Sequence, residues 1–289
     1  MLLQRIITAS ILAPLILLAI YFLSTPQFAV VWGLVILVAG WEWVSLIDIK
    51  KVYQKIIFLL FLGVSIFGVF SWTVILEIVA QLFKMPEIRN FSGAIEWTVI
   101  APVLFWFIIM ILIRNKPKDL LALKIKTGYK VFLGWFVLLA AWMFLERLRR
   151  LYGAEMVIYF FLLIWAADIA AYFGGKKYGI TKLAPDISPG KTIEGMYAAL
   201  ASAIVCAVIL GLIYGFPAII ISDFALLSVL TVLVSIYGDL FFSYAKRLKG
   251  VKDSSSLLPG HGGLLDRIDS VIAGAPVFYA GVFLIGRMT

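Results

Sequence analysis

The sequence has 289 residues, of which 63% are hydrophobic and 14% are charged, and its formal net charge is +9. An ordinary soluble domain has about 25% charged residues, so this composition excludes a soluble globular protein. Nucleic-acid binding is also disfavoured, because the basic residues are spread over many short segments and are not gathered on one domain surface.

Long apolar runs predict transmembrane helices along the whole chain. Runs of about 18 or more apolar residues can cross a hydrocarbon layer of about 30 Å as helices, and they lack the alternation typical of membrane β-strands. We therefore expect an all-α polytopic membrane protein with about nine transmembrane helices. The predicted spans are 6–23, 28–47, 56–80, 95–113, 131–146, 156–173, 193–213, 219–243 and 268–286.

The positions of the basic residues predict the orientation of these spans. Lys and Arg in short loops favour the cytoplasmic side. Most of them lie at the N-terminus and in alternate loops, which predicts a multi-pass protein of the cytoplasmic (inner) membrane whose positive charge faces anionic lipid headgroups. The opposite side would hold Lys84, Arg89, Arg147, Arg149, Arg150 and Arg287. The cluster at 147–150 is the one loop that disagrees with this assignment.

Acidic residues occur where a membrane span should be apolar. A carboxylate near the bilayer centre costs about 2.5 kcal/mol or more on insertion scales, so each one needs a partner or a function. Glu42 lies near the end of its span and could snorkel to water. The others border loops or interfaces; they are Glu77, Asp168, Glu194, Asp223, Asp239 and Asp269. Asp168, Glu194, Asp239 and Asp269 border the two polar loops 174–192 and 246–267, which together predict a site at the cytoplasmic face.

The first of these loops ends in SPGKTIEG. Ser188 and Pro189 are typical of an N-cap and a first helical residue, which would place Lys191, Thr192 and Glu194 in the first turn of a helix. The segment is not a P-loop, because the required glycine and preceding strand are missing. A helix N-terminus carrying Lys191 and Thr192 could bind an anion, and structural capping is the alternative.

The second loop concentrates groups that suit phosphates. Asp239 and Ser243 lie four residues apart, so on a helix they share one face. Four cations follow that suit phosphate oxygens: Lys246, Arg247, Lys249 and Lys252. The glycine-dense segment PGHGG then allows the backbone to approach a ligand closely.

Two aspartates at the start of the last span suggest a metal site. Asp266 and Asp269 lie three residues apart, so both project from one face of a first turn. Carboxylates aimed at one point suit Mg²⁺, which leaves positions free for phosphates. The alternative is helix stabilisation through the macrodipole, worth about 0.3–1 kcal/mol each, which explains neither Asp239 nor the cations. Arg267 could pair with a carboxylate or a phosphate, and His261 with a phosphate or a leaving group.

The segment from Ser243 to Asp269 resembles the signature of the phosphatidate cytidylyltransferases, also called CDP-diacylglycerol synthases. The shared elements are Ser243, Lys246–Arg247, Lys252–Asp253, Pro259, His261–Gly262–Gly263, Asp266–Arg267 and Asp269. SPGKTIEG resembles the family's second recurring element, with Gly190 where a lysine often stands.

The resemblance implies a Mg²⁺-dependent reaction of CTP with phosphatidic acid that gives CDP-diacylglycerol and pyrophosphate. It implies metal binding by Asp239, Asp266 and Asp269, with a second, monovalent cation such as K⁺ left open. Catalytic roles are expected for these aspartates, Lys252, Arg267 and His261. Substrate binding is expected for Asp168, Ser188, Lys191, Thr192, Glu194, Ser243, Lys246, Arg247, Gly262 and Gly263. Residues 131–289 would form the catalytic unit, and the role of the helices in 1–130 is open.

Three other classes of membrane protein are weighed against this one, and the lipid kinases among them have a similar topology. A polyprenol or lipid kinase would transfer only a phosphate. A cation transporter would place acids at several depths, and the lysines beside these acids would repel its cargo. A CDP-alcohol phosphotransferase is excluded, because its longer aspartate series is absent. Membrane lipids are expected partners, and the oligomeric state stays open, with a homodimer among the alternatives.

Overall fold

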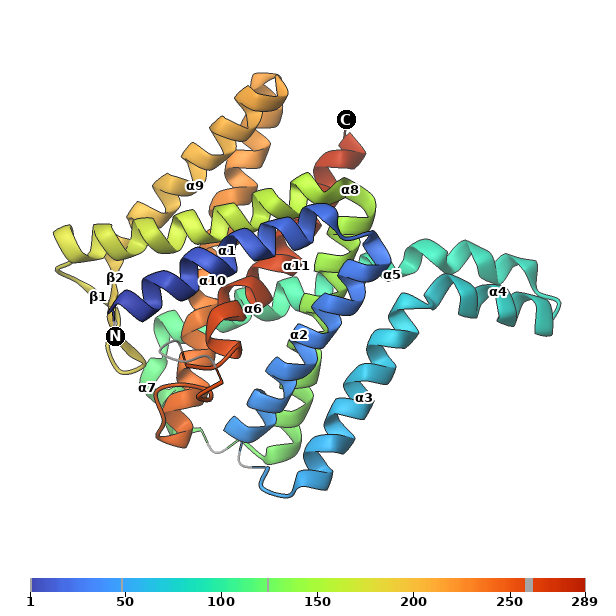
Figure 1. Cartoon of the computed structure of the whole chain (residues 1–289), viewed down its shortest axis with the longest axis horizontal. Coiled ribbons are helices and arrows are strands. Elements are labelled where there is room, and N and C mark those ends of the chain that lie inside the picture. Colours follow the sequence, from blue (N-terminus) through green and yellow to red (C-terminus); the bar gives the residue numbers. More distant parts are fainter. Residues whose placement is uncertain (1, 48, 124, 258–261, 289) are drawn as a thin grey trace.

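The computed structural model describes residues 2–47, 49–123, 125–257 and 262–288 (Figure 1). These residues form helices and one small hairpin, which confirms the all-α prediction. The helices are α1 Leu2–Phe22, α2 Thr25–Leu46, α3 Val52–Phe70, α4 Trp72–Leu82, the 3₁₀ helix η1 Pro86–Gly93, α5 Ala94–Trp97, α6 Ile100–Asn115, α7 Pro117–Ala122, α8 Thr127–Tyr178, α9 Ile193–Tyr214, α10 Ala218–Lys249 and α11 Leu265–Met288. The hairpin consists of β1 Lys182–Ala184 and β2 Ser188–Thr192.

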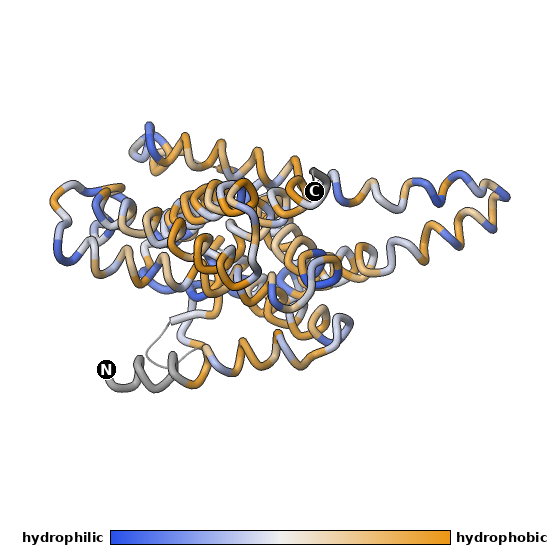
Figure 2. Tube along the Cα trace, turned by 90° about the horizontal axis from the view of Figure 1, so that it is seen from above, coloured by the Kyte–Doolittle hydropathy of each residue, from blue (hydrophilic) through white to orange (hydrophobic). Residues whose placement is uncertain are grey.

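Seven helices in the described part of the chain are long and apolar enough to cross a membrane, so the protein is multi-pass. Figure 2 shows hydrophobic residues along the helices and hydrophilic residues at several of their ends. The predicted spans 131–146 and 156–173 both lie in α8, which turns at Gly153 with φ 86° and ψ 179°. A positive φ favours glycine there, and α8 is therefore two helices joined by a turn. The predicted span 56–80 is similarly divided between α3 and α4.

The arginine cluster at 147–150 does not lie in a loop, and that prediction is wrong. These arginines belong to α8 and face other helices. Arg147 Nη1 lies 3.1 Å from Glu96 Oε1, and Arg150 Nη2 lies 2.6 Å from Glu146 Oε1. Arg149 Nη2 donates to the carbonyl of Leu23, between α1 and α2, at 3.0 Å. Because these residues lie in a helix and make contacts there, they are not loop charges that bear on the orientation.

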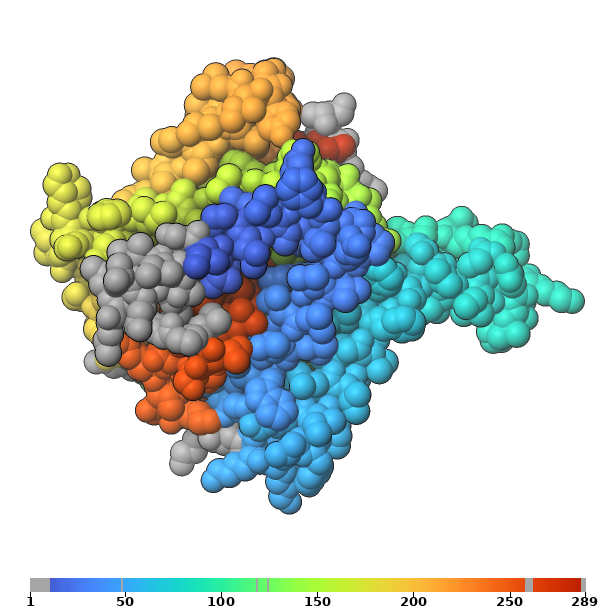
Figure 3. All heavy atoms as spheres, viewed as in Figure 1, coloured from blue at the N-terminus to red at the C-terminus, as the bar shows by residue number. Residues whose placement is uncertain are grey.

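The C-terminal helices pack closely because small residues lie at their crossings. A Cβ atom built on Gly238 of α10 would lie 2.2 Å from the Cβ of Ala273 in α11. One built on Gly174 of α8 would lie 2.4 Å from the Cβ of Ala198 in α9. By contrast, α4 and η1 project away from the other helices (Figures 1 and 3). The close crossings therefore belong to the part of the bundle that carries the polar loops.

The N-terminal helix α2 is docked onto α8 through two tryptophans. Trp43 Nε1 donates to the carbonyl of Lys130 at 3.0 Å, and Trp142 Nε1 donates to the carbonyl of Ala29 at 3.0 Å. Gly134 leaves room for the Trp43 ring, since a Cβ atom there would lie 1.9 Å from Trp43 Nε1. The position of α2 relative to the C-terminal helices thus depends on this contact.

Gly134→Ala should destabilise the protein by about 1–3 kcal/mol, because the added methyl overpacks the Trp43 ring. The measurement is thermal unfolding of the purified protein in detergent, where we expect a lower melting temperature. Gly128→Ala is the matched control, since it lies in the same helix with no atom within 4 Å of the added Cβ. Equal melting temperatures for the two variants would contradict the packing described here.

Candidate active site

Asp239 of α10 and Asp269 of α11 face each other where the two helices cross. Their carboxyl groups are in contact, and Asp269 is only 7% exposed. The contact follows from the crossing at Gly238, since a Cβ there would lie 3.3 Å from the carbonyl oxygen of Asp269. Two of the three predicted metal ligands are thus brought together. We call Asp239 and Asp269 the acidic pair.

Two lysines from different elements neutralise the acidic residues. Lys191 Nζ lies 2.7 Å from Asp239 Oδ2 and also donates to the carbonyl of Ile236 at 3.1 Å. Lys246 Nζ lies 2.6 Å from Asp266 Oδ1, and both lysines act electrostatically on the acidic pair. Like charges buried together require such compensation. Both lysines were predicted site residues, and the structure brings them together with the carboxylates.

Other predicted residues of α10 and the following loop have different surroundings. Ser243 Oγ donates to Asp239 Oδ1 at 3.2 Å, which confirms that the two share a helix face. The Arg247 guanidinium donates to the carbonyls of Ile187 and Val251, at 3.1 and 3.2 Å, and so ties the hairpin to α10. Lys252 is exposed on the loop.

Asp266 is turned toward the glycine-containing loop and away from the acidic pair. Its Oδ2 accepts from the backbone N–H groups of Ser254 and Gly263, at 2.8 and 3.0 Å, and from Ser254 Oγ at 3.0 Å. Gly262 has φ 83°, a conformation that favours glycine, and a Cβ there would lie 3.0 Å from Asp266 Oδ2. At these glycines the backbone thus comes close to the Asp266 carboxylate. His261 lies outside the described residues.

The three predicted metal ligands are not grouped in this structure. Across residues 2–47, 49–123, 125–257 and 262–288, no three His, Cys, Asp or Glu side chains are arranged as a metal site. Asp266 is instead bound by Lys246 and by the backbone N–H groups of Ser254 and Gly263. The pair itself offers hard oxygen ligands of the kind that Mg²⁺ prefers.

The SPGKTIEG segment forms a strand and a helix start, so the predicted N-cap is wrong. Ser188 pairs with Ala184 in the antiparallel hairpin, which keeps the backbone extended. The N-cap of α9 is Thr192, whose Oγ1 accepts from the Gly195 N–H at 3.1 Å. Glu194 is in the first turn as expected, and its carboxylate accepts from the Thr181 N–H at 3.1 Å. Lys191 therefore reaches Asp239 from a strand and not from a helix turn.

A polar cavity of about 390 Å³ lies between α8, the hairpin, α9 and α10. Asp168 lines it from α8, and Arg267, which is exposed, acts on that carboxylate electrostatically. The charged and hydroxyl side chains on its wall are Asp168, Tyr172, Lys176, Lys182, Lys191, Thr192 and Asp239. Cations thus line a space that ends at the acidic pair, an arrangement suited to an anionic ligand with a bound cation.

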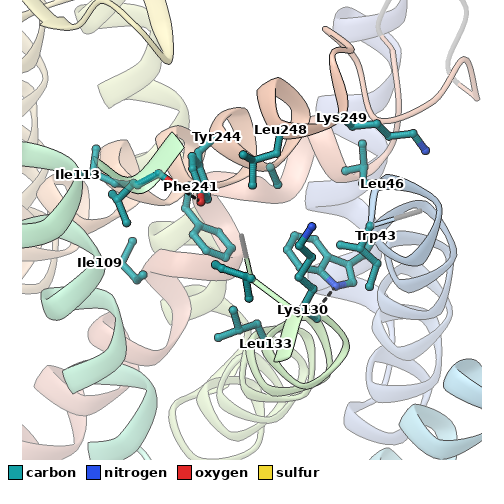
Figure 4. A pocket seen from close by; sticks show the side chains of 14 residues that line it. Trp43, Leu46, Ile109, Ile113, Lys130, Leu133, Phe241, Tyr244, Leu248 and Lys249 are labelled. Atoms are coloured by element: carbon teal, nitrogen blue, oxygen red, sulfur yellow. Dashed lines mark hydrogen bonds between the residues drawn. The ribbon is translucent and has the colours of Figure 1, made fainter. Parts of the chain in front are cut away.

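A second cavity with apolar walls lies against the opposite face of α10 (Figure 4). Phe241, Tyr244 and Leu248 of α10 line it together with Trp43 of α2. On a helix, these α10 positions point away from Asp239 and Ser243. No acidic residue is among its lining residues, so the polar cavity is the better candidate for the site.

Sequence reasoning missed the role of Glu42, which does not snorkel to water. Its side chain is 2% exposed and accepts hydrogen bonds from the loop before α11 and from the first turn of that helix. A lone acid in an apolar span indicates that donors must be near, but the sequence does not say which ones. Its partners lie more than 200 residues away and became visible only in the fold.

The sequence matches known proteins over nearly its whole length. Residues 3–285 match a family model described as the cytidylyltransferase family. The chain is 34% identical to a phosphatidate cytidylyltransferase of Haemophilus influenzae, over 96% of this chain and 97% of that protein. It is 36% identical to one of Pseudomonas aeruginosa, over 99% and 98%. A Bacillus subtilis protein of the same name is 41% identical over 44% of this chain and 47% of its own length.

Lys246→Met should destabilise the protein by about 3–5 kcal/mol, because it leaves the buried Asp266 carboxylate without its cation. The double variant Lys246→Met/Asp266→Asn should recover part of that loss, since the uncompensated charge is then removed. Thermal unfolding of both variants in detergent measures the effect. Equal or greater destabilisation of the double variant would contradict a buried pair at this position.

Proposed function

Because this chain belongs to the cytidylyltransferase family, we propose that it joins the cytidylyl group of CTP to phosphatidate at the acidic pair. It is an integral membrane nucleotidyltransferase, and its products are CDP-diacylglycerol and pyrophosphate. Family membership disfavours the lipid kinase and the cation transporter that the sequence pattern left open. The observation that carries the location of the site is that Lys191 and Asp239 pair on the wall of the polar cavity, with Asp269 in contact with Asp239.

The reaction at this site is an in-line displacement. A phosphate oxygen of phosphatidate forms a bond to the α-phosphorus of CTP, while the bond between that phosphorus and the bridging oxygen of pyrophosphate breaks. The lipid phosphate is already ionised near neutral pH, so no strong general base is required. Catalysis then depends on positioning and on neutralising negative charge.

The cations of the polar cavity would supply this neutralisation. Lys176, Lys182 and Lys191 line the cavity and would contact the triphosphate. Ser188, Thr192 and Glu194 would hold the hairpin and the start of α9 around it. From the other side, Lys252, Arg267 and His261 would meet the pyrophosphate as it leaves.

Mg²⁺ fits the donor set of this site. The acidic pair would hold it, and Asp266, which pairs with Lys246, is the third carboxylate that the resemblance implies as a ligand. The bound ion would supply charge neutralisation on the triphosphate. A second, monovalent cation such as K⁺ would share the same group of carboxylates, where Asp168 adds a further negative charge.

We further propose that the site faces the cytoplasm of a bacterial inner membrane. CTP is a soluble nucleotide, and the basic loops predict that the C-terminal end of α10 and the start of α11 lie on the cytoplasmic side. Phosphatidate and the surrounding membrane lipids would reach the site from the bilayer. A homodimer would leave this arrangement unchanged, because the charged residues of the site come from one chain.

Asp269→Asn and Asp239→Asn should each lower turnover by about 10²–10³-fold, because each removes a carboxylate that would hold the cation neutralising the reacting phosphates. The assay supplies purified protein in detergent with CTP labelled in its cytidine, Mg²⁺ and phosphatidic acid, and it measures labelled lipid and pyrophosphate. Glu77→Gln is the control, since Glu77 is exposed and pairs with Arg89 in the projecting segment. Transfer of only a phosphate by the wild type, or half the wild-type rate in either aspartate variant, would contradict the proposal.

Removal of divalent ions with EDTA should abolish product formation, and added Mg²⁺ should restore it. The reason is that the carboxylates and the triphosphate repel each other unless a cation lies between them. The same assay without K⁺ tests the second cation, and the quantity measured is the rate of product formation. Full activity in excess EDTA would overturn the metal proposal without affecting the assignment of the substrates.

A further inference from the structure

The geometry points to Glu42 of α2 as a positioning residue for the reaction, an inference that rests on the proposed function. Its carboxylate accepts four hydrogen bonds from one short stretch of chain. The hydroxyls of Ser254 and Ser255 donate to it at 3.0 and 2.5 Å. The N–H groups of Leu264 and Leu265 donate at 3.0 and 2.7 Å. Residues 254–255 and residues 264–265 are therefore hydrogen-bonded to the same side chain.

Glu42 acts as a cap that comes from a different helix. The first N–H groups of a helix have no partner within the helix, and a negative charge there is favoured by the helix dipole. α11 begins at Leu265, and Leu264 before it has no side-chain oxygen that could cap. Glu42 satisfies both N–H groups, and in return these donors stabilise a carboxylate that is 2% exposed.

The contacts of Glu42 continue directly to a predicted catalytic carboxylate. Ser254 Oγ lies 3.0 Å from Glu42 Oε2 and 3.0 Å from Asp266 Oδ2, so one hydroxyl touches both acids. Asp266 in turn binds Lys246, the lysine that also acts on the acidic pair. The position of Asp266, and through it that of Lys246, depends on where Glu42 holds Ser254 and the start of α11.

Gly263 is needed because Glu42 is there. A Cβ atom on Gly263 would lie 2.6 and 2.8 Å from the two Glu42 oxygens and 1.9 Å from Ser254 Oγ. The last glycine of the PGHGG segment therefore makes room for the side chain of an N-terminal helix. This contact adds a role for the glycine beyond approach to a ligand.

α2 is packed against α10, so it can fix the position of this loop. The ring of Trp43, the next residue, stacks on Phe241 of α10 with centroids 6.0 Å apart and planes at 15° (Figure 4). Lys249 at the end of α10 donates to the carbonyl of Ser45. Glu42 is thus fixed to the helix that carries Asp239, and it transmits that position to α11, which carries Asp266 and Asp269.

The substitution Glu42→Gln tests this role with little change in shape. One carboxylate oxygen becomes an NH₂ group, which cannot accept the hydrogen bonds that now reach that oxygen. We expect kcat to fall about 10- to 100-fold, the range seen when a residue that orients a ligand is removed. The KM for CTP should change less than kcat, since the lysines of the polar cavity are untouched. Glu42→Asp should restore only part of the kcat, because the shorter aspartate side chain cannot reach both groups of donors.

A double-mutant comparison separates positioning from a purely structural role. If Glu42 acts through Ser254, the loss of kcat in Glu42→Gln/Ser254→Ala should be smaller than the product of the losses in the single variants. Glu77→Gln serves as the control with unchanged kcat. If Glu42→Gln does not fold, Ser255→Ala keeps the carboxylate and removes one donor, and it should lower kcat with a nearly unchanged melting temperature.

Two outcomes have different meanings. If wild-type protein forms no CDP-diacylglycerol from CTP and phosphatidate, the proposed function fails. If the wild type is active while Glu42→Gln keeps more than half of its kcat, or while the folded Ser255→Ala variant does so when Glu42→Gln does not fold, the positioning role is overturned and the proposed function stands. A loss confined to melting temperature, with kcat intact, also overturns it.

Discussion

The structure of the site depends on the compensation of buried carboxylates inside a membrane protein. Asp239 and Asp269 lie in contact, Asp269 is buried and Asp239 lines the polar cavity, and two like charges this close are unfavourable unless opposite charge is near. Lys191 arrives from the hairpin, and Lys246 arrives from α10 itself. Lys246 could not reach Asp266 of α11 if α10 and α11 crossed at a larger distance. The arrangement of these charges therefore depends on the close packing of α10 and α11 at Gly238.

This constraint has a chemical consequence within the proposed function. The cations that would bind phosphates are paired with the carboxylates that would bind a metal. An incoming nucleotide with its cation offers each group a replacement: phosphate for Lys191 and Lys246, and a divalent ion for the acidic pair. The site can thus keep its charges balanced before and after substrate binds, and a cation alone or an anion alone would leave one half uncompensated.

Features that depend on local backbone geometry could be predicted from local sequence patterns. The shared face of Asp239 and Ser243 follows from helix periodicity, and the apolar runs determine the helical class. Long-range contacts were not predictable in the same way. Ser188 was taken for a helix cap because a serine before proline favours one, whereas pairing with β1 keeps it extended. Arg147 was assigned to a loop because its partner, Glu96, lies in another helix.

The proposed positioning role of Glu42 would make the N-terminal helices part of the catalytic unit. The start of α11 cannot cap itself, because Leu264 offers no acceptor and Gly263 has no side chain. A larger residue at 263 would collide with Ser254 and with any carboxylate placed there. The acceptor must therefore come from outside the loop, and a helix anchored on α10 is the one that keeps Asp266 in register with Asp239. Separating residues 1–130 from 131–289 would remove that reference, so the two parts form one functional structure.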